Sequence, residues 1–294
     1  MTLLTDKGLE NTMEQLLLLA IGAAIEAGQA IMDVYQSDFV VEHKADHSPL
    51  TLADRKSHRI LVDRLRSTPY PILSEEGRDL SFEERKHWNT FWLLDPLDGT
   101  KEFVKRNGEF TVNVALIAEG RPVMGVIFVP VHDILYYGRR DEGAYKLSPA
   151  ADRLNRLIQG TGNTLGPIQE INAAAERLPA PSSTPGKYTV VGSRSHSTPE
   201  VQEIVNRLKK QHGDVELISA GSSLKICMVA EGRAHLYPRT GPTMEWDTAA
   251  GQAIAESAGA RMVAFETDKP LLYNKEDLHN PWFVVESGRK YTDG

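Results

Sequence analysis

The sequence has a single cysteine, Cys227, and no surplus of basic residues, and each shortage excludes a class of protein. One cysteine cannot form an intramolecular disulfide, so a reducing compartment is the simplest inference. The 33 Lys and Arg residues against 40 Asp and Glu give a formal net charge of −7. This balance argues against a nucleic-acid binder, which would need a basic face. No His/Cys spacing typical of a zinc site is present either.

The N-terminal region lacks the pattern of a secretory signal. Asp6, Glu10 and Glu14 precede the apolar stretch, where a basic region would be required. The apolar run 16–25 is too short to span a bilayer, and Glu26 interrupts it. We therefore expect a cytoplasmic protein without a transmembrane segment, with a peripheral position at the inner membrane as the alternative.

The order of hydrophobic patterns predicts a mixed α and β protein in two parts. Helices are expected at 11–35 and from about 53 to 65, and strands at 39–44, 71–74 and 91–94. Four further strand patterns predict an antiparallel meander, at 110–117, 122–129, 134–138 and 143–145. Composition then shifts between 148 and 187, where 168–178 is a candidate helix. Strand and helix patterns alternate beyond 187, so we divide the chain into an α+β domain, 1–155, and a smaller α/β domain, 156–294. Cys227 lies in an apolar helical pattern and is expected to be a buried structural thiol.

The stretch 93–100, Leu-Leu-Asp-Pro-Leu-Asp-Gly-Thr, carries the strongest chemical signal. An apolar strand leads into Asp95, and Pro96 is expected to end the strand in a turn. Gly99 permits a tight backbone, and Thr100 begins a helix whose free N–H groups suit a phosphate. Asp-Pro and Asp-Gly pairs are equally typical of an ordinary surface turn, so this stretch needs support from elsewhere in the chain.

Other acids supply that support, although each has a structural explanation of its own. Asp54 lies in the first turn of a helix and could serve only the helix dipole, Glu75 follows a short strand in what could be a solvated loop, and Asp247 heads an Ala-rich helix as a possible N-cap. Together Glu75, Asp95, Asp98 and Asp247, with the Leu97 carbonyl, form an all-oxygen ligand set of the kind that Mg²⁺ prefers. Hard cations beside a phosphate-binding helix start indicate phosphoryl chemistry.

Three segments, 74–76, 95–100 and 246–251, resemble the signatures of the lithium-sensitive, Mg²⁺-dependent phosphatases of the inositol monophosphatase superfamily. Within it, stretches 44–54, 95–112, 193–196 and 221–225 resemble the bacterial 3'(2'),5'-bisphosphate nucleotidases. The likeness covers nearly the whole chain and departs from the pattern in the longer region 148–187 and before Asn11. It implies a layered α-β-α-β-α sandwich.

The resemblance also implies roles for individual residues. Asp95, Asp98 and Asp247 would hold one Mg²⁺; Glu75, Asp95 and the Leu97 carbonyl would hold another, and a third ion could join through Glu75, giving two to three ions. Asp54 would accept a proton from Thr100, which orients a metal-activated water for in-line attack, so that Asp54, Glu75 and Thr100 are the catalytic residues. The substrate-binding residues would be those that surround the phosphate and the nucleotide: Leu97, Asp98, Gly99, Thr100, His196, Ser222, Lys225, Arg239 and Asp247.

The expected substrate is a small phosphorylated nucleotide, adenosine 3',5'-bisphosphate, with its sulfated relative 3'-phosphoadenosine 5'-phosphosulfate as a second candidate. No nucleic-acid polymer is expected as a partner, and the chain would be a monomer or a homodimer. An inositol or sugar phosphate phosphatase would share the metal acids. A haloacid-dehalogenase-type phosphatase needs two Asp residues two positions apart, whereas Asp95 and Asp98 are three apart. A non-catalytic Mg²⁺ and nucleotide sensor is the alternative from another class.

Overall fold

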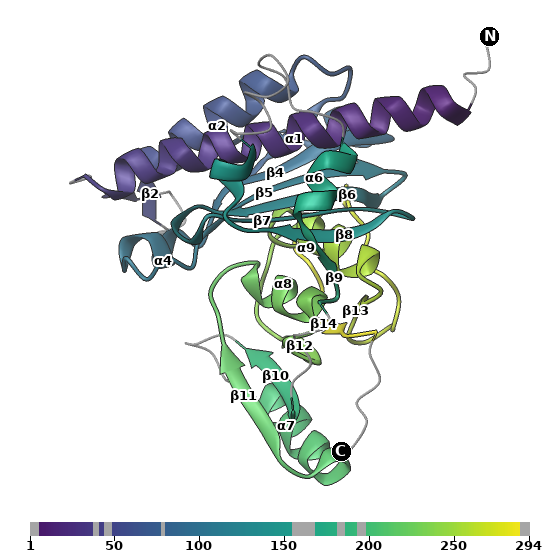
Figure 1. Ribbon diagram of the computed structural model, residues 1–294. Coiled ribbons are helices and arrows are strands. Elements are labelled where there is room, and N and C mark those ends of the chain that lie inside the picture. The colour runs from purple at the N-terminus through teal and green to yellow at the C-terminus, as the bar shows by residue number, and fades with distance from the viewer. Residues whose placement is uncertain are drawn as a thin grey trace.

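The computed structural model describes residues 6–37, 41–43, 49–77, 80–154, 168–180, 186–192 and 198–288. Two β-sheets and the helices packed on them form five layers, which Figure 1 shows from top to bottom. The helical layers are α1 (Asp6–Tyr35) with α2 (Leu52–Leu65), then α8 (Leu224–Glu231) with α9 (Glu245–Ser257), and finally α7 (Pro199–His212). The α-β-α-β-α order is confirmed.

The first sheet has the strand order β3-β4-β5-β6-β7-β8-β9. Its strands are β3 (Ile72–Ser74), β4 (Thr90–Asp98), β5 (Thr111–Ala118), β6 (Arg121–Val129), β7 (Ile134–Arg139), β8 (Gly143–Leu147) and β9 (Glu176–Leu178). Neighbours from β4 onward are antiparallel, and only β3 runs parallel to β4. The meander predicted from the alternating patterns is therefore confirmed as β5 to β8. A separate pair, β1 (Val41–His43) and β2 (Pro49–Thr51), is antiparallel.

The segment 168–178, a candidate helix by sequence, contains a helix and a strand. Helix α6 (Ile168–Ala174) is followed by β9, which pairs with β8 and completes the first sheet. The sheet that began before residue 100 thus takes its last strand from beyond residue 155. The division of the chain at 155/156 stays a prediction.

The second sheet lies on the other side of α8 and α9 and has the order β11-β10-β12-β14-β13. Its strands are β10 (Tyr188–Gly192), β11 (Val215–Ser219), β12 (Leu236–Arg239), β13 (Arg261–Ala264) and β14 (Phe283–Glu286). Strand β10 is parallel to β11 and β12, while β14 is antiparallel to β12 and β13. This mixed sheet is the α/β part that the alternating patterns predicted.

Helices α8 and α9 share one apolar core with the facing sides of both sheets. The approach of α9 to the first sheet is so close that a Cβ on Gly125 of β6 would lie 2.3 Å from the Ala250 carbonyl oxygen. Only glycine permits this spacing. Cys227 is buried in the same core, as expected. Because both helices are fixed on the strands, their N-terminal ends are held near the end of β4.

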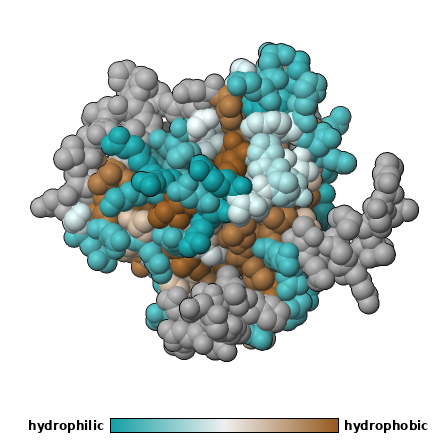
Figure 2. All heavy atoms as spheres, turned by 90° about the horizontal axis from the view of Figure 1, so that it is seen from above, coloured by the Kyte–Doolittle hydropathy of each residue, from teal (hydrophilic) through white to brown (hydrophobic). Residues whose placement is uncertain are grey.

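Helix α1 is longer than its apolar run suggested. Within Met13–Tyr35 an 18-residue window has a mean hydropathy of 1.6, so by length and composition this helix could cross a bilayer, and the shortness of the run 16–25 does not exclude it. One face of this stretch, including Ala20, Ile21 and Ala24, is buried against the first sheet, and a core helix meets the same criteria of length and composition. The outward face over α1 and α2 carries polar and apolar side chains side by side (Figure 2).

Candidate metal and phosphate site

Strand β4 carries two of the predicted acids and does not end at Asp95. Its pairing with β5 joins Asp95 to Asn113 and resumes only at Asp98 with Thr111, so the ladder is irregular between the two acids. Pro96 falls in this irregularity, where its missing N–H removes no ladder hydrogen bond. The expected strand end and turn at Pro96 was therefore wrong, and the irregularity takes its place. Asp95 is buried and Asp98 is half-buried.

Each of the three aspartates accepts a backbone hydrogen bond. The Leu97 N–H donates to Asp95 Oδ1 (3.1 Å), the Ser223 N–H to Asp98 Oδ2 (2.6 Å), and the Met244 N–H to Asp247 Oδ2 (2.9 Å). These backbone hydrogen bonds orient the side chains. Within the described residues they fall on one oxygen of each carboxylate, which leaves the second oxygen for another ligand.

The charges of five acids act on one another. Burial raises the pKa of Asp95 well above its usual value, and the charges of Glu75, Asp98, Asp247 and Asp54 raise it further. Burial, and then the charge of Asp98, raises the pKa of Asp247 to about 8. Burial raises the pKa of Asp98 to about 6. The structure therefore brings together all five acids that the sequence singled out, although they come from β4, α2, α9 and the 3₁₀ turn η1 (Glu75–Gly77) after β3.

The donor chemistry of this cluster fits a divalent cation. Buried carboxylates that repel one another must bind protons or a cation, and an all-oxygen set suits Mg²⁺. In the ranges that the structure covers, no three His, Cys, Asp or Glu side chains already converge as a ligand set. Since each Asp has one oxygen held by the backbone, a bound ion requires small side-chain rotations that bring the second oxygens to one point.

A cavity of about 210 Å³ lies between the acids of β4 and the acid of α9. Asp98 and Asp247 both line it, so the acids of β4 and α9 share one space. Gly99, which also lines it, has a φ of +92° and precedes the short helix α4 (Thr100–Val104). A side chain there would be strained, and its Cβ would lie 3.2 Å from Ser222 Cβ. The Thr100 hydroxyl donates to the Leu97 carbonyl oxygen at 3.5 Å. The predicted helix start beside the acids is confirmed.

Among the residues expected to bind the substrate, Ser222, Lys225 and Arg239 line this cavity together with Asp98, Gly99 and Asp247, while Leu97 and Thr100 flank Asp98 and Gly99 in the sequence. The Ser222 hydroxyl donates to the Glu109 carbonyl oxygen (2.9 Å), and the buried Lys225 Nζ donates to the Ser222 carbonyl oxygen (2.6 Å). Arg239 donates from Nη2 to the Pro242 carbonyl oxygen (3.0 Å), and its buried Nε has no hydrogen-bond partner in the described part of the chain. His196 lies outside the described residues.

Two lysines that were not among the predicted site residues also line the cavity, Lys101 and Lys105. They stand four residues apart, directly after the Asp-Gly-Thr motif, and this spacing places both on one side of a helix. The four-residue spacing of these lysines was therefore a signal that the sequence contained. Tyr237 is a further wall residue, and its ring centroid lies 5.6 Å from Lys225 Nζ. No local pattern marks Tyr237, because it reaches the cavity from the second sheet.

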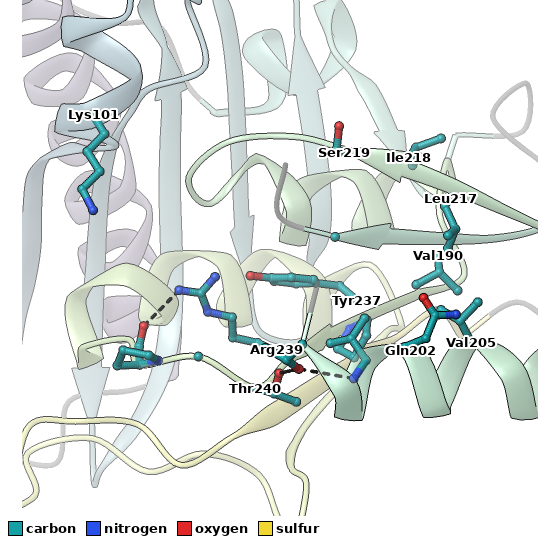
Figure 3. Close-up of a pocket in the computed structure, with 16 residues that line it drawn as sticks. Lys101, Val190, Gln202, Val205, Leu217, Ile218, Ser219, Tyr237, Arg239 and Thr240 are labelled. Atoms are coloured by element: carbon teal, nitrogen blue, oxygen red, sulfur yellow. Dashed lines mark hydrogen bonds between the residues drawn. The ribbon is translucent and has the colours of Figure 1, made fainter. Parts of the chain in front are cut away.

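A larger cavity of about 670 Å³ adjoins the first. Lys101, Tyr237 and Arg239 line both. Figure 3 shows Lys101 on one side of this space, Arg239 and Tyr237 along its floor, and apolar side chains at the far end. The apolar wall comes from β10, β11 and α7, as Val190, Leu217, Val201 and Val205. An anionic group near Arg239 could therefore be joined to a flat apolar group in the larger cavity.

Comparison with known proteins agrees with this arrangement. The model of the inositol monophosphatase family matches residues 12–290. The 3'(2'),5'-bisphosphate nucleotidase CysQ of Escherichia coli K12 is 44% identical over 267 residues, which are 89% of this chain and 96% of that protein. CysQ of Haemophilus influenzae is 33% identical, and the match covers 96% of this chain and 95% of that protein. A crystal structure of CysQ from Bacteroides thetaiotaomicron, a bacterial member of the inositol monophosphatase family, superimposes with a TM-score of 0.82 at 48% identity, covering 94% of this chain and 98% of that one.

The raised carboxyl pKa values predict how stability changes with pH when divalent cations are removed. The folded protein keeps a proton on Asp247 up to about pH 8, whereas a free carboxyl with a pKa of 3.8 loses it near pH 4. The free energy of unfolding should therefore fall as the pH rises from 4 to 8. Asp247→Asn removes this contribution, so in EDTA the melting temperature of the variant should fall less steeply over that range. Parallel curves for wild type and variant would contradict the assignment, and added divalent cation should flatten the wild-type curve alone.

Proposed function

The chain belongs to the inositol monophosphatase family, and from this we propose that it is a 3'(2'),5'-bisphosphate nucleotidase. It removes the 3'-phosphate of adenosine 3',5'-bisphosphate, giving AMP and phosphate, and depends on Mg²⁺. The observation that carries the choice of substrate is the pair of adjoining cavities. The smaller is lined by acids and by basic side chains, the larger is mostly apolar, and Arg239 and Lys101 line both. The names of the bacterial relatives support the same activity.

Each of the two cavities binds a different part of the substrate. The 3'-phosphate binds in the smaller cavity, beside Asp98 and Asp247, and the backbone N–H groups of Gly99 and Thr100 receive it. Arg239 and Lys225 bind the 5'-phosphate, because the buried Arg239 Nε lacks another acceptor among the described residues. The base lies against the apolar wall formed by Val190 and its neighbours. An inositol phosphate would leave the larger cavity empty, which favours the nucleotide.

The chemistry follows from the positions of the acids. Glu75, Asp95, the Leu97 carbonyl, Asp98 and Asp247 would hold two to three Mg²⁺ ions, which would neutralise charge on the phosphate and lower the pKa of a bound water. Thr100 orients the attacking water through its hydroxyl, and Asp54, fully buried in the first turn of α2, accepts the proton from Thr100. The water then attacks phosphorus in line with the departing ribose oxygen. The protein forms no covalent intermediate.

Composition supports the proposed substrate class and location of the protein. The net charge of −7 suits a small-molecule enzyme rather than a partner of nucleic-acid polymers. A single, buried cysteine agrees with a cytoplasmic location. The enzyme acts as a monomer or a homodimer, and 3'-phosphoadenosine 5'-phosphosulfate is a second substrate because it carries the same phosphate on the same ribose 3'-oxygen, which is the leaving group.

Substrate preference tests the choice between nucleotide and inositol phosphate. With Mg²⁺ present, kcat/KM for adenosine 3',5'-bisphosphate should exceed that for inositol 1-phosphate by about a hundredfold or more, since only the nucleotide uses the larger cavity and its cations. Phosphate release measured with both substrates at matched ionic strength decides. Comparable rates, or a faster inositol phosphate, would favour a sugar phosphate phosphatase instead.

Asp98→Asn tests whether the protein is an enzyme or a sensor. The variant should lose Mg²⁺-dependent phosphate release by about a hundredfold or more, because a ligand and its charge are removed together. Asp141→Asn is the matched control: Asp141 is an exposed turn residue with a φ of 69°, which Asn also adopts readily. It should keep wild-type turnover. Nucleotide binding by the wild type without any phosphate release would support the sensor.

A further inference from the structure

Helix α9 begins with a glutamate that is fully buried, Glu245, two residues before Asp247. Its carboxylate accepts three hydrogen bonds from two residues of the chain's last quarter. The Asn274 N–H donates to Oε2 at 2.7 Å, while the Lys275 N–H and Lys275 Nζ donate to Oε1 at 3.0 and 2.6 Å. A carboxylate with this many partners fixes the local geometry firmly.

The segment 274–276, which contains both residues that donate to Glu245, is also bound by a buried arginine. Arg85, the last residue of helix α3 (Phe82–Arg85), donates from Nη1 to the Asn274 side-chain oxygen (3.0 Å) and the Lys275 carbonyl oxygen (2.7 Å). Its Nη2 donates to the Glu276 carbonyl oxygen at 3.0 Å, and its own carbonyl accepts from Asn274 Nδ2 at 2.8 Å. Residues 274–276 are therefore bonded on one side to a helix that precedes β4 and on the other to α9.

The chain then returns to the first turn of α9. The Leu278 carbonyl oxygen accepts the Glu245 N–H at 2.9 Å. Asn280 Nδ2 donates to the Met244 carbonyl oxygen (2.6 Å) and to Thr248 Oγ1 (3.0 Å). Since the Met244 N–H binds Asp247 Oδ2, the residue that orients Asp247 is itself tied to this loop.

We propose that Arg85, residues 274–276 and Glu245, together called the clasp, position Asp247 relative to Asp95 and Asp98. The clasp joins α3, which leads into the strand of Asp95 and Asp98, to the helix of Asp247. Its members are positioning residues, because none of them lines either cavity. The inference rests on the proposed function in one respect, that Asp247 is a ligand of the metal.

The negative charge of Glu245 is balanced by positive charges within the clasp. A fully buried carboxylate is costly unless a cation faces it. Lys275 Nζ is paired with it at 2.6 Å, and the charge of Arg85 also acts on it. The clasp therefore anchors α9 beside the acid cluster without adding a net negative charge there.

The chain offers a matched control in a second buried glutamate. Glu231, at the C-terminal end of α8, accepts the Tyr136 hydroxyl of β7 and lies 2.7 Å from Lys146 Nζ of β8. It is 1% exposed, against 0% for Glu245. Both residues tie a central helix to a distant segment, Glu231 to the first sheet and Glu245 to residues 274–275. Glu231 lies at the C-terminal end of its helix, whereas the N-terminal end of that helix faces the acid cluster.

The experiment compares Glu245→Gln with Glu231→Gln by calorimetric titration of Mg²⁺ and by thermal unfolding in EDTA. An amide at position 245 turns an NH₂ group toward one of the backbone N–H donors, so it breaks one side of the clasp. Both variants should melt lower than wild type. Glu245→Gln should weaken Mg²⁺ binding by about tenfold, the usual range for a residue that orients a metal ligand, and Glu231→Gln should leave it within about twofold, as expected of a site away from the ligands. Unchanged Mg²⁺ binding in Glu245→Gln, or equal weakening in both, would overturn the clasp.

Arg85→Met keeps the test decisive if Glu245→Gln does not fold. It loosens residues 274–276 without touching α9 and should also weaken Mg²⁺ binding, while Arg85→Lys restores part of the loss; unchanged binding in Arg85→Met would overturn the clasp. The two claims fail separately. Wild type that binds Mg²⁺ but releases no phosphate from nucleotides contradicts the proposed activity and leaves the clasp supported by its own variants. Wild type that does not bind Mg²⁺ overturns both.

Discussion

The repulsion between buried carboxylates at the end of β4 is the constraint on which the rest of this structure depends. Asp95 is fully enclosed, and Glu75, Asp98, Asp247 and Asp54 all raise its pKa. Backbone N–H groups offset part of the cost by binding one oxygen of each aspartate. A fold that keeps such a cluster in place must hold it from several sides, and four elements do so: β4 supplies two acids, while α2, η1 and α9 each supply one.

The division of the site between the two halves explains the packing of α8 and α9. Both helices lie between the sheets, and their N-terminal ends bring Ser223, Lys225 and Asp247 to the acids of the first half. The second sheet and α7 add a mostly apolar cavity beside them. In the proposed function, phosphate chemistry and recognition of the rest of the substrate therefore belong to different layers, and Arg239 and Lys101 line both cavities.

Local sequence predicted a good part of this arrangement and failed where distant segments decide. The meander and the helix start at Thr100 each leave a pattern within a few residues, so they could be read from the chain. The acids at 54, 75, 95, 98 and 247 were singled out as a set and by the family resemblance, because Asp54, Glu75 and Asp247 each had a structural explanation when taken alone. Strand β4 continued past Pro96 because its pairing with β5 tolerates an irregularity, which only the partner strand reveals. Strand β9 is likewise a strand because it pairs with β8, which lies about 30 residues earlier in the chain, and this pairing is not visible in the local pattern. The contact of Arg85 with residues 274–276 spans about 190 positions, and neither end shows it in the sequence.

The central claim is that these acids hold divalent metal in one shared site, and diffraction from crystals soaked in Mn²⁺ tests it most directly. Mn²⁺ takes the same oxygen ligands as Mg²⁺ and scatters anomalously. The account predicts anomalous peaks at about 2.1 Å from the carboxylate oxygens of Asp95, Asp98 and Asp247, with Glu75 at a neighbouring ion. Peaks confined to other parts of the molecule, with Asp247 turned away from Asp95 and Asp98, would contradict it.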